Sequence, residues 1–474
     1  MKRTTKLIEN IDYITIGLYF LLVLMGWLNI YSAVYNDQHT SIFDISQRYG
    51  KQLMWIGASV ILISLILLID SSFFPMFSYP IYIFTVLLLI AVLLFGKEVN
   101  GARSWFQLGG FRLQPAEFTK FATNLAFAHF LSSYNFKLLK IKNLIIVGFI
   151  LFFPALLILL QNDTGSALVY FAFILVLYRE GLPGSILLIG LLLAIIFIVT
   201  LVANVFAVSI MLLIITLIAY FFIRKRINEV IKASAIILGV SSVFWGIAYL
   251  FNLELNPQYF IFAGIGVSTI VFFKFAFKNK LNYIFILSAI VISGILFSFS
   301  VNYIFDKVLE SHQRDRINDL LGIEFDPLGA GYNVNQSKIA IGSGGFAGKG
   351  FLQGTQTKYD FVPEQSTDFI FCTVGEEWGF LGTSAVLIIF VLFLIRLIII
   401  AERQRSTFSR VYGYGVVSIF FFHIAVNVGM TIGIAPVIGI PLPFFSYGGS
   451  SLWAFTILLF ILLRLDANRM ELLK

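Results

Sequence analysis

Residues 185–222 read Ser185-Ile-Leu-Leu-Ile-Gly-Leu-Leu-Leu-Ala-Ile-Ile-Phe-Ile-Val-Thr-Leu-Val-Ala-Asn-Val-Phe-Ala-Val-Ser-Ile-Met-Leu-Leu-Ile-Ile-Thr-Leu-Ile-Ala-Tyr-Phe-Phe222, without one charged side chain. A helix that crosses the hydrocarbon core of a bilayer needs about 20 mostly apolar residues. The stretch is long enough for two crossings, which we predict at about 185–205 and 207–222. It therefore indicates a membrane protein.

The composition of the whole chain agrees with this stretch. Of its 474 residues 59% are hydrophobic and only 12% are charged, whereas a soluble protein carries roughly 25% charged residues. The net charge of +8 comes from Lys and Arg scattered in short gaps between apolar runs. This pattern favours control of membrane topology and contact with anionic lipid over nucleic-acid binding. The single cysteine, Cys372, excludes an intrachain disulfide.

Further apolar segments lie on both sides of the opening stretch, and we predict roughly fourteen spans in all. The others run over about 13–34, 52–69, 81–95, 118–131, 144–160, 166–178, 233–251, 259–273, 283–304, 368–397, 411–430 and 451–463. The first is too long for the apolar core of a signal peptide, so we expect it to be retained. The expected fold class is an all-α, polytopic transmembrane helix bundle with a large external loop.

Lys and Arg in the short loops set the expected orientation. They gather at both termini and in the loops around 137–142, 224–226, 274–280 and 403–410. Since cytoplasmic loops carry the excess of Lys and Arg, both termini are predicted to be cytoplasmic. The loops 97–120 and 305–367 then lie outside. No internal repeat is visible, so an inverted-repeat transporter has no support in the sequence.

The first external loop contains candidate binding residues. Arg103 could hold an anion, and Trp105 suits the membrane interface. Glu117 and Lys120 stand three residues apart at the start of a helix, a spacing that lets them pair. They are either a structural ion pair or the lining of a substrate cavity, which is the default reading of charge inside a membrane. Asp163, in a later external turn, either caps the next helix or contributes to the same site.

The large external loop is rich in glycine between Gly329 and Gly354, and turns of this kind can present backbone N–H groups to anions. Alone, the glycine content is weak evidence for an anion-binding site, because the loop lacks a nucleotide-binding lysine pattern. Its candidate residues are Asp326, Lys338, Glu364 and Asp368. Arg316, in a basic segment just before it, belongs either to a solvated face or to a phosphate site.

Residues 427–451 carry three prolines and five glycines at membrane depth, as Asn427-Val-Gly-Met-Thr-Ile-Gly-Ile-Ala-Pro-Val-Ile-Gly-Ile-Pro-Leu-Pro-Phe-Phe-Ser-Tyr-Gly-Gly-Ser-Ser451. Such residues break a helix. Irregular backbone survives at this depth only where it is buried in protein or lines a cavity.

These motifs resemble the SEDS family (shape, elongation, division and sporulation). The stretch 427–451 resembles its signature. The residues Asn100-Gly-Ala-Arg, Trp105, Gln114-Pro-Ala-Glu117 and Lys120 resemble its first external loop, and Asp326-Pro-Leu-Gly, Gly342-Ser-Gly-Gly, Pro363-Glu364 and Thr367-Asp368 resemble its large loop. The sequence at 340–343 and 354–356 is more similar to the family members that act in elongation than to those that act in division. The likeness covers roughly residues 10–180 and 300–470.

The resemblance implies a peptidoglycan glycosyltransferase that polymerises lipid II on the outer face of the cytoplasmic membrane, with a class B penicillin-binding protein as partner. It places the family's essential aspartate at Asp326. No cofactor is implied, although a divalent cation stays open. The family has ten spans, so we expect a core at 1–180 and 283–474, with about four extra spans at 181–282 that do not build the site. The usual Gln-Pro-Asp-Leu-Gly is Gln161-Asn-Asp-Thr-Gly165 here, which puts the role of Asp163 in doubt.

Glycosyl transfer needs a base for the acceptor hydroxyl and positive groups for a departing pyrophosphate. Asp326 is the expected base. The expected cations are Arg103, Lys120, Lys338 and Arg316. A lipid II flippase would have a similar architecture, with Glu117 and Lys120 along its pathway, and a scaffold would need no essential carboxylate. An essential carboxylate in an external loop favours the enzyme.

Overall fold

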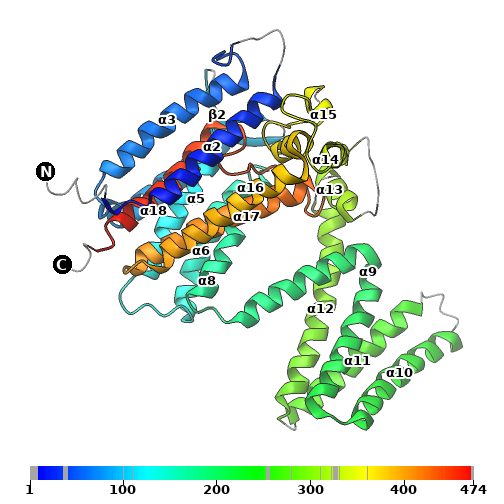
Figure 1. Ribbon diagram of the computed structural model, residues 1–474. Coiled ribbons are helices and arrows are strands. Elements are labelled where there is room, and N and C mark those ends of the chain that lie inside the picture. Colours follow the sequence, from blue (N-terminus) through cyan, green and yellow to red (C-terminus); the bar gives the residue numbers. More distant parts are fainter. Residues whose placement is uncertain are drawn as a thin grey trace. The chain divides into compact units, whose positions relative to one another are not determined.

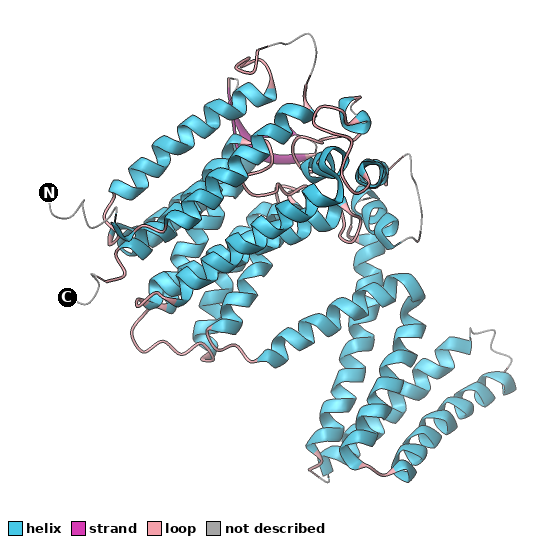
Figure 2. Cartoon of the chain, viewed as in Figure 1, coloured by secondary structure: helices cyan, strands magenta, loops and turns pink. Residues whose placement is uncertain are grey.

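The computed structural model describes residues 9–35, 41–99, 101–109, 111–251, 257–278, 280–309, 311–321, 323, 329, 331–359 and 361–470. Helices make up most of this part of the chain (Figure 1), and the strands are confined to one small sheet (Figure 2). The polytopic helical fold predicted from the sequence is confirmed. The chain forms two compact units, unit 1 with Met1–Pro183 and Asp326–Lys474, and unit 2 with Gly184–Phe325.

Unit 1 contains two sets of helices separated in sequence by unit 2. The N-terminal set comprises α2 (Tyr13–Ala33), α3 (Arg48–Leu68), α4 (Phe73–Phe95), α5 (Pro115–Leu131), α6 (Ile141–Leu159), α7 (Thr164–Leu168), the 3-10 helix η1 (Val169–Ala172) and α8 (Phe173–Arg179). The C-terminal set comprises α14 (Tyr332–Gly344), α15 (Thr355–Lys358), α16 (Ile370–Glu402), α17 (Thr407–Thr431) and α18 (Gly449–Ala467).

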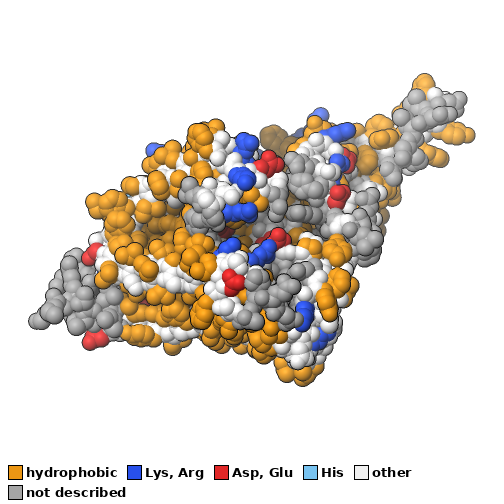
Figure 3. All heavy atoms as spheres, turned by 90° about the horizontal axis from the view of Figure 1, so that it is seen from above, with side chains coloured by type: hydrophobic (Ala, Val, Ile, Leu, Met, Phe, Trp, Pro, Cys, Tyr) orange, Lys and Arg blue, Asp and Glu red, His pale blue; other side chains and the backbone are white. Residues whose placement is uncertain are grey.

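Burial shows which helices of unit 1 are central. In the most apolar stretch of α18 83% of the residues are buried, against 22% in α3. Helix α18 packs against α3, α5 and α17, and the fully buried rings of Tyr412, Phe420 and Phe460 lie in the shared core. Hydrophobic side chains cover much of the outer surface (Figure 3). This arrangement suits helices whose outward faces contact lipid.

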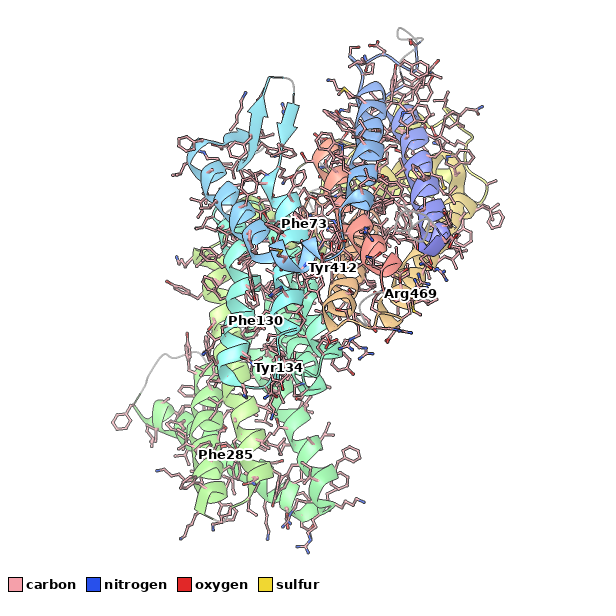
Figure 4. The ribbon with its side chains drawn as sticks, turned by 90° about the vertical axis from the view of Figure 1, so that its left-hand side faces the viewer. Phe73, Phe130, Tyr134, Phe285, Tyr412 and Arg469 are labelled. Carbon is pink, nitrogen blue, oxygen red and sulfur yellow. The ribbon has the colours of Figure 1, made fainter. Side chains whose placement is uncertain are left out.

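The first external loop forms a small antiparallel sheet that the all-α prediction did not include. Its strands are β1 (Lys97–Val99), β2 (Ala102–Leu108) and β3 (Phe111–Leu113), in the order β1-β2-β3. The sheet continues α4 and leads into α5 (Figure 4). Gly101, with φ of +81°, makes the turn between β1 and β2. The hairpin places Arg103 and Trp105 at the end of the bundle where α4 ends and α5 begins.

The two ends of unit 1 can be told apart by contacts along α2. Before its start, Asp12 pairs with Arg396 at 2.5 Å and with Arg403 at 3.1 Å, near the end of α16. At its other end, Ser32 donates a hydrogen bond to Glu377, near the start of α16. The last turn of α18 reaches the same end as Asp12, because its Asp466 also pairs with Arg403. The residues near both termini therefore lie at one end of unit 1, and residues 349–358 of the large loop lie at the other, where they contact Glu376 and Glu377.

Unit 2 consists of α9 (Gly184–Arg224), α10 (Ile227–Leu250), α11 (Pro257–Lys278), α12 (Asn282–Lys307) and α13 (Ser311–Leu321). Helix α9 is broken at Asn204, whose φ of 79° is not helical. The Asn204 side chain accepts hydrogen bonds from the N–H groups of Phe206 and Ala207, which caps the second half. The apolar stretch 185–222 therefore folds as two helices, each about as long as the membrane is thick.

Eleven helices of the described chain are long and apolar enough to cross a membrane. The prediction of fourteen differs for two reasons. The segments predicted at 118–131 and 166–178 correspond to helices too short to be counted as spans. The segments predicted at 185–205 and 207–222 are the two halves of α9, which counts once. Helix α12 and the segment up to Phe325 belong to unit 2, although we assigned residues from 283 onward to the core.

Candidate functional site

Residues 432–448, here named the Pro-Gly segment, join α17 to α18 without forming a helix. Glycines supply the backbone conformations that other residues avoid, with φ of +77° at Gly433 and +68° at Gly439. Asn427, fully buried on α17, fixes the segment. Its amide group donates two hydrogen bonds of 2.8 Å, to the carbonyl oxygens of Asp368 and Ile440. The predicted irregular backbone is therefore present. Its second half, residues 440–446, is mostly buried, whereas Ile432, Ile434 and Gly439 are exposed.

Glu117 and Lys120 form the pair that their spacing predicts. The Lys120 ammonium lies 2.7 Å from the Glu117 carboxylate, and each side chain is 3% exposed. The Lys120 ammonium also lies 3.1 Å from Nε2 of His423. The Nδ1 atom of His423 lies 3.1 Å from the Pro441 carbonyl oxygen. Because a carbonyl only accepts, Nδ1 donates to Pro441 and Nε2 accepts from Lys120. The pair is thus connected to the Pro-Gly segment, and its contact with a substrate stays a prediction.

Asp163 caps a helix, which is one of the two roles that the sequence left open. Its carboxylate accepts from the N–H of Ser166 at 3.0 Å, at the start of α7. Its second oxygen accepts from the side chain of Gln114 at 2.8 Å. Gly165 packs so closely on Ile438 that a Cβ would overlap its carbonyl oxygen. This cap therefore also contacts the Pro-Gly segment.

Lys338 and Asp368 reach the same segment from the large loop and its end. The exposed Lys338 side chain crosses Gly433, where it fills the space that a Cβ would need. Within the described residues, no hydrogen bond or ion pair to its ammonium group is present. Asp368 is half-buried, and one of its carboxylate oxygens faces Gly439. A lysine and an aspartate from different elements thus border one irregular segment.

Glu364 lies beside this segment, in contact with a residue that sequence reasoning missed. Its carboxylate is 3.7 Å from the guanidinium group of Arg48, and both side chains are nearly half exposed. Arg48 also donates to Ser366 at 2.6 Å and lies over the ring of Tyr447. The guanidinium group is positioned from three sides at the start of α3.

The other predicted residues belong to the small sheet, to unit 2, or to the part of the chain outside the described residues. Arg103 is exposed on β2, where its backbone N–H bonds to the carbonyl of Gln161, and Trp105 is on the same strand. Arg316 belongs to α13 in unit 2, and its side chain is not among those described. Asp326 lies outside the described residues. After it, the N–H of Tyr332 bonds to the carbonyl of Gly329 as α14 begins.

Two adjacent buried glutamates on α16 were also missed. The Glu376 carboxylate accepts from the Lys349 ammonium at 2.7 Å and from the N–H groups of Gln356 and Thr357 at 2.8 and 2.9 Å. Glu376 therefore holds the first turn of α15 and, through Lys349, the loop that precedes it. Glu377 accepts from Ser32. Two carboxylates inside an apolar run were the available signal, since buried charge in a span marks a built site.

No group of three or more His, Cys, Asp or Glu side chains is placed to hold a metal ion in the described part of the chain. Whether a divalent cation is required stays open.

A family model described as "Cell cycle protein", for FtsW, RodA and SpoVE, matches residues 12–233 and 209–471. Peptidoglycan glycosyltransferase RodA of Treponema pallidum is 34% identical over 465 residues, 98% of this chain and 99% of that protein. Peptidoglycan glycosyltransferase MrdB of Escherichia coli K12 is 30% identical over 435 residues, 91% and 88% of the two chains.

A solved chain described as "Structural coordination of polymerization and crosslinking by a peptidoglycan synthase complex" is 25% identical. It superposes with a TM-score of 0.62 and covers 97% of this chain and 99% of that one. The family model, the relatives and the fold agree across nearly the full length. The chain belongs to the FtsW/RodA/SpoVE family of polytopic membrane proteins, the SEDS family.

Proposed function

We propose that this chain is a peptidoglycan glycosyltransferase of the bacterial cytoplasmic membrane, which polymerises lipid II during cell elongation. The observation that carries the proposal is the Pro-Gly segment. It collects charged groups from α5, α14 and the end of the large loop, at the end of unit 1 opposite the termini. The relatives of this chain named RodA and MrdB are peptidoglycan glycosyltransferases.

In the proposed reaction the 4-hydroxyl of the acceptor N-acetylglucosamine attacks the anomeric carbon of the donor chain. A carbon–oxygen bond forms there, the bond to undecaprenyl pyrophosphate breaks, and the anomeric configuration inverts. Asp326 accepts the hydroxyl proton as general base. Pro327 follows it in the sequence and favours an extended conformation, so the carboxylate can face a substrate above the bilayer.

The leaving pyrophosphate needs positive charge, and the structure offers two groups at the Pro-Gly segment. Lys338 is exposed and unpaired within the described chain, so its ammonium can bind phosphate oxygens. Arg48 presents a guanidinium group suited to bidentate contact. Lys120 is buried against Glu117, so it acts on a substrate only if this end of the bundle opens. We assign Lys120 and Glu117 to positioning the segment through His423.

The proposed partner is a class B penicillin-binding protein, which would crosslink the strands as they form. Both termini are proposed to be cytoplasmic and the large loop external. Cysteine labelling of whole cells tests this orientation in a Cys372→Ser background. Tyr359→Cys, exposed near α15, should react from outside. Arg405→Cys, exposed at the opposite end of α16, should react only after permeabilisation. The reverse pattern would overturn the topology.

Incubation of the purified full-length chain with fluorescent lipid II, with and without the transpeptidase, tests the function. The proposal predicts long glycan strands that a muramidase digests. Proteoliposomes carrying lipid II in both leaflets distinguish a flippase. Accelerated movement of lipid II between leaflets without any polymer would assign transport instead of synthesis.

A further inference from the structure

Unit 2 contains a cavity that the proposed reaction does not use. Its volume is about 450 Å³, and it is lined by residues of α9, α10, α11 and α12. Pockets for small ligands typically measure about 300–1,000 Å³. Most of its wall is apolar, with Leu213, Ile237, Phe272 and Val291 among the lining side chains. A cavity of this chemistry takes a hydrocarbon chain.

The cavity is as deep as one leaflet of a bilayer. On α9 its lining extends from Arg224, the last residue of the helix, back to Leu213. Eleven residues of helix correspond to roughly 16 Å, and half of the hydrocarbon core is about 15 Å. The lining begins at the same ends of the other helices, at Glu229 on α10 and just before Tyr283 on α12.

The mouth of the cavity is positively charged. Arg224 pairs with Glu229 at 3.1 Å, and its guanidinium group lies over the ring of Tyr283. Arg226 shares the same carboxylate at 3.3 Å. Lys232, exposed one turn further along α10, lines the mouth and makes no ion pair within the described chain. One carboxylate is therefore shared by two arginines, with Lys232 nearby on the same lining, and positive charge is left over for a ligand.

More cations stand at the same helix ends without lining the cavity. They are Lys225, Lys274, Lys278 and Lys280. Between residues 222 and 232 and between 272 and 283, Glu229 is the one acidic residue. Sticks that end in nitrogen stand at this end of unit 2, near the labelled Phe285 (Figure 4). By the excess of Lys and Arg this end faces the cytoplasm, where anionic lipids attract such clusters.

We propose that unit 2 binds an anionic phospholipid of the cytoplasmic leaflet, with one acyl chain in the cavity and its phosphate between Arg224 and Lys232. Basic pockets between membrane helices on this side bind such headgroups. A zwitterionic lipid offers the same chain but no net charge to match the surplus. In this proposal the helices of unit 2 form a lipid-binding module that contains none of the residues assigned to the Pro-Gly segment.

Native mass spectrometry of the purified full-length chain, titrated with phosphatidylglycerol or phosphatidylcholine, tests the proposal. Phosphatidylglycerol should bind more tightly. Arg224→Gln/Lys232→Gln should weaken it roughly tenfold or more, because each basic side chain near a membrane surface contributes to such binding. The control Lys274→Gln/Lys278→Gln removes equal charge from the same end without touching the cavity, and should bind normally. Ala233→Phe, which fills the cavity, should reduce binding of both lipids.

Equal loss in the control pair would reduce the effect to general surface charge and overturn the site. Equal binding of the two phospholipids, or normal binding by Ala233→Phe, would do the same. Undecaprenyl phosphate is titrated in parallel, and its preference over phosphatidylglycerol would overturn the assigned occupant. Arg224→Lys/Lys232→Arg keeps both charges and should retain binding. Loss there with intact size-exclusion and melting profiles would also contradict the proposal.

Discussion

Lys120 on α5 donates to Nε2 of His423 on α17 across 3.1 Å, inside the bundle and shielded from solvent. His423 in turn donates to Pro441. A buried charge pair is therefore the point at which the first external loop is connected to the Pro-Gly segment. The pair is a positioning device whose disruption should move the segment.

Single charge reversal at this pair should strongly destabilise the protein. Removing one partner of a buried ion pair leaves an uncompensated charge and costs about 3–5 kcal/mol. Glu117→Lys or Lys120→Glu should therefore lower the melting temperature in detergent markedly, and the double reversal should recover part of it. Polymerase activity separates the roles. If recovery of folding restores activity as well, the pair is purely structural.

Gly165→Ala should destabilise the protein because a Cβ would overlap the Ile438 carbonyl oxygen. Backbone atoms cannot give way as a flexible side chain can, so α7 or the Pro-Gly segment must shift. We expect a loss of about 1–3 kcal/mol, typical of overpacking. Gly17→Ala is the matched control, since no atom lies within 4 Å of the added carbon and alanine favours the helix. Equal melting temperatures of the two variants would refute the close contact.

Glu376→Gln should loosen the segment around α15. The carboxylate accepts from Lys349 and from two backbone N–H groups, and bonds to a charged group contribute about 1.5–3 kcal/mol each. Limited proteolysis should then cut faster near residues 349–358. Glu364→Gln removes a carboxylate that is nearly half exposed and should leave the cutting rate unchanged. Unaltered proteolysis of Glu376→Gln would show that the loop is held elsewhere.

The contacts at the opposite end predict a pH dependence. Burial opposes ionisation of Asp12, but hydrogen bonds from Arg396 and Thr15 prevail and lower its pKa from 3.8 to about 2. A lowered folded-state pKa gives stability that is complete above the unfolded value and is lost as pH falls through about 4 to 2. The difference amounts to about 2 kcal/mol. Asp12→Asn should melt lower at pH 6 and lose less on acidification. Parallel curves for the two proteins would contradict the pairing.

Much of this architecture could be predicted from the sequence, since membrane spans depend on local composition. The stretch 185–222 and the break at 427–451 were sufficient for the fold class and the irregular segment. The pair of Glu117 and Lys120 followed from helical spacing. What could not be predicted depends on long-range contacts, as between Arg48 and Glu364. Spacing also could not show that Asp163 would both cap α7 and bond to Gln114.

The sheet at 97–113 escaped prediction because its strands are short and bounded by glycines, which also suit a plain loop. Glu376 and Glu377 escaped because they were read as part of an apolar run. That the helices of unit 2 are an insertion and do not build the active site stays a prediction. Their lipid site can be tested without reference to catalysis.

The central claim is that Asp326 is the general base, and polymerisation of lipid II by Asp326→Asn tests it most directly. Asparagine keeps the shape and can still order a turn, but it cannot accept the proton. The variant should fold, bind its partner and polymerise about two to four orders of magnitude more slowly. Asp315→Asn, an exposed carboxylate on α13, is the control and should retain activity. Polymerisation by Asp326→Asn at near wild-type rate would contradict the assignment, even if Asp326→Ala were inactive.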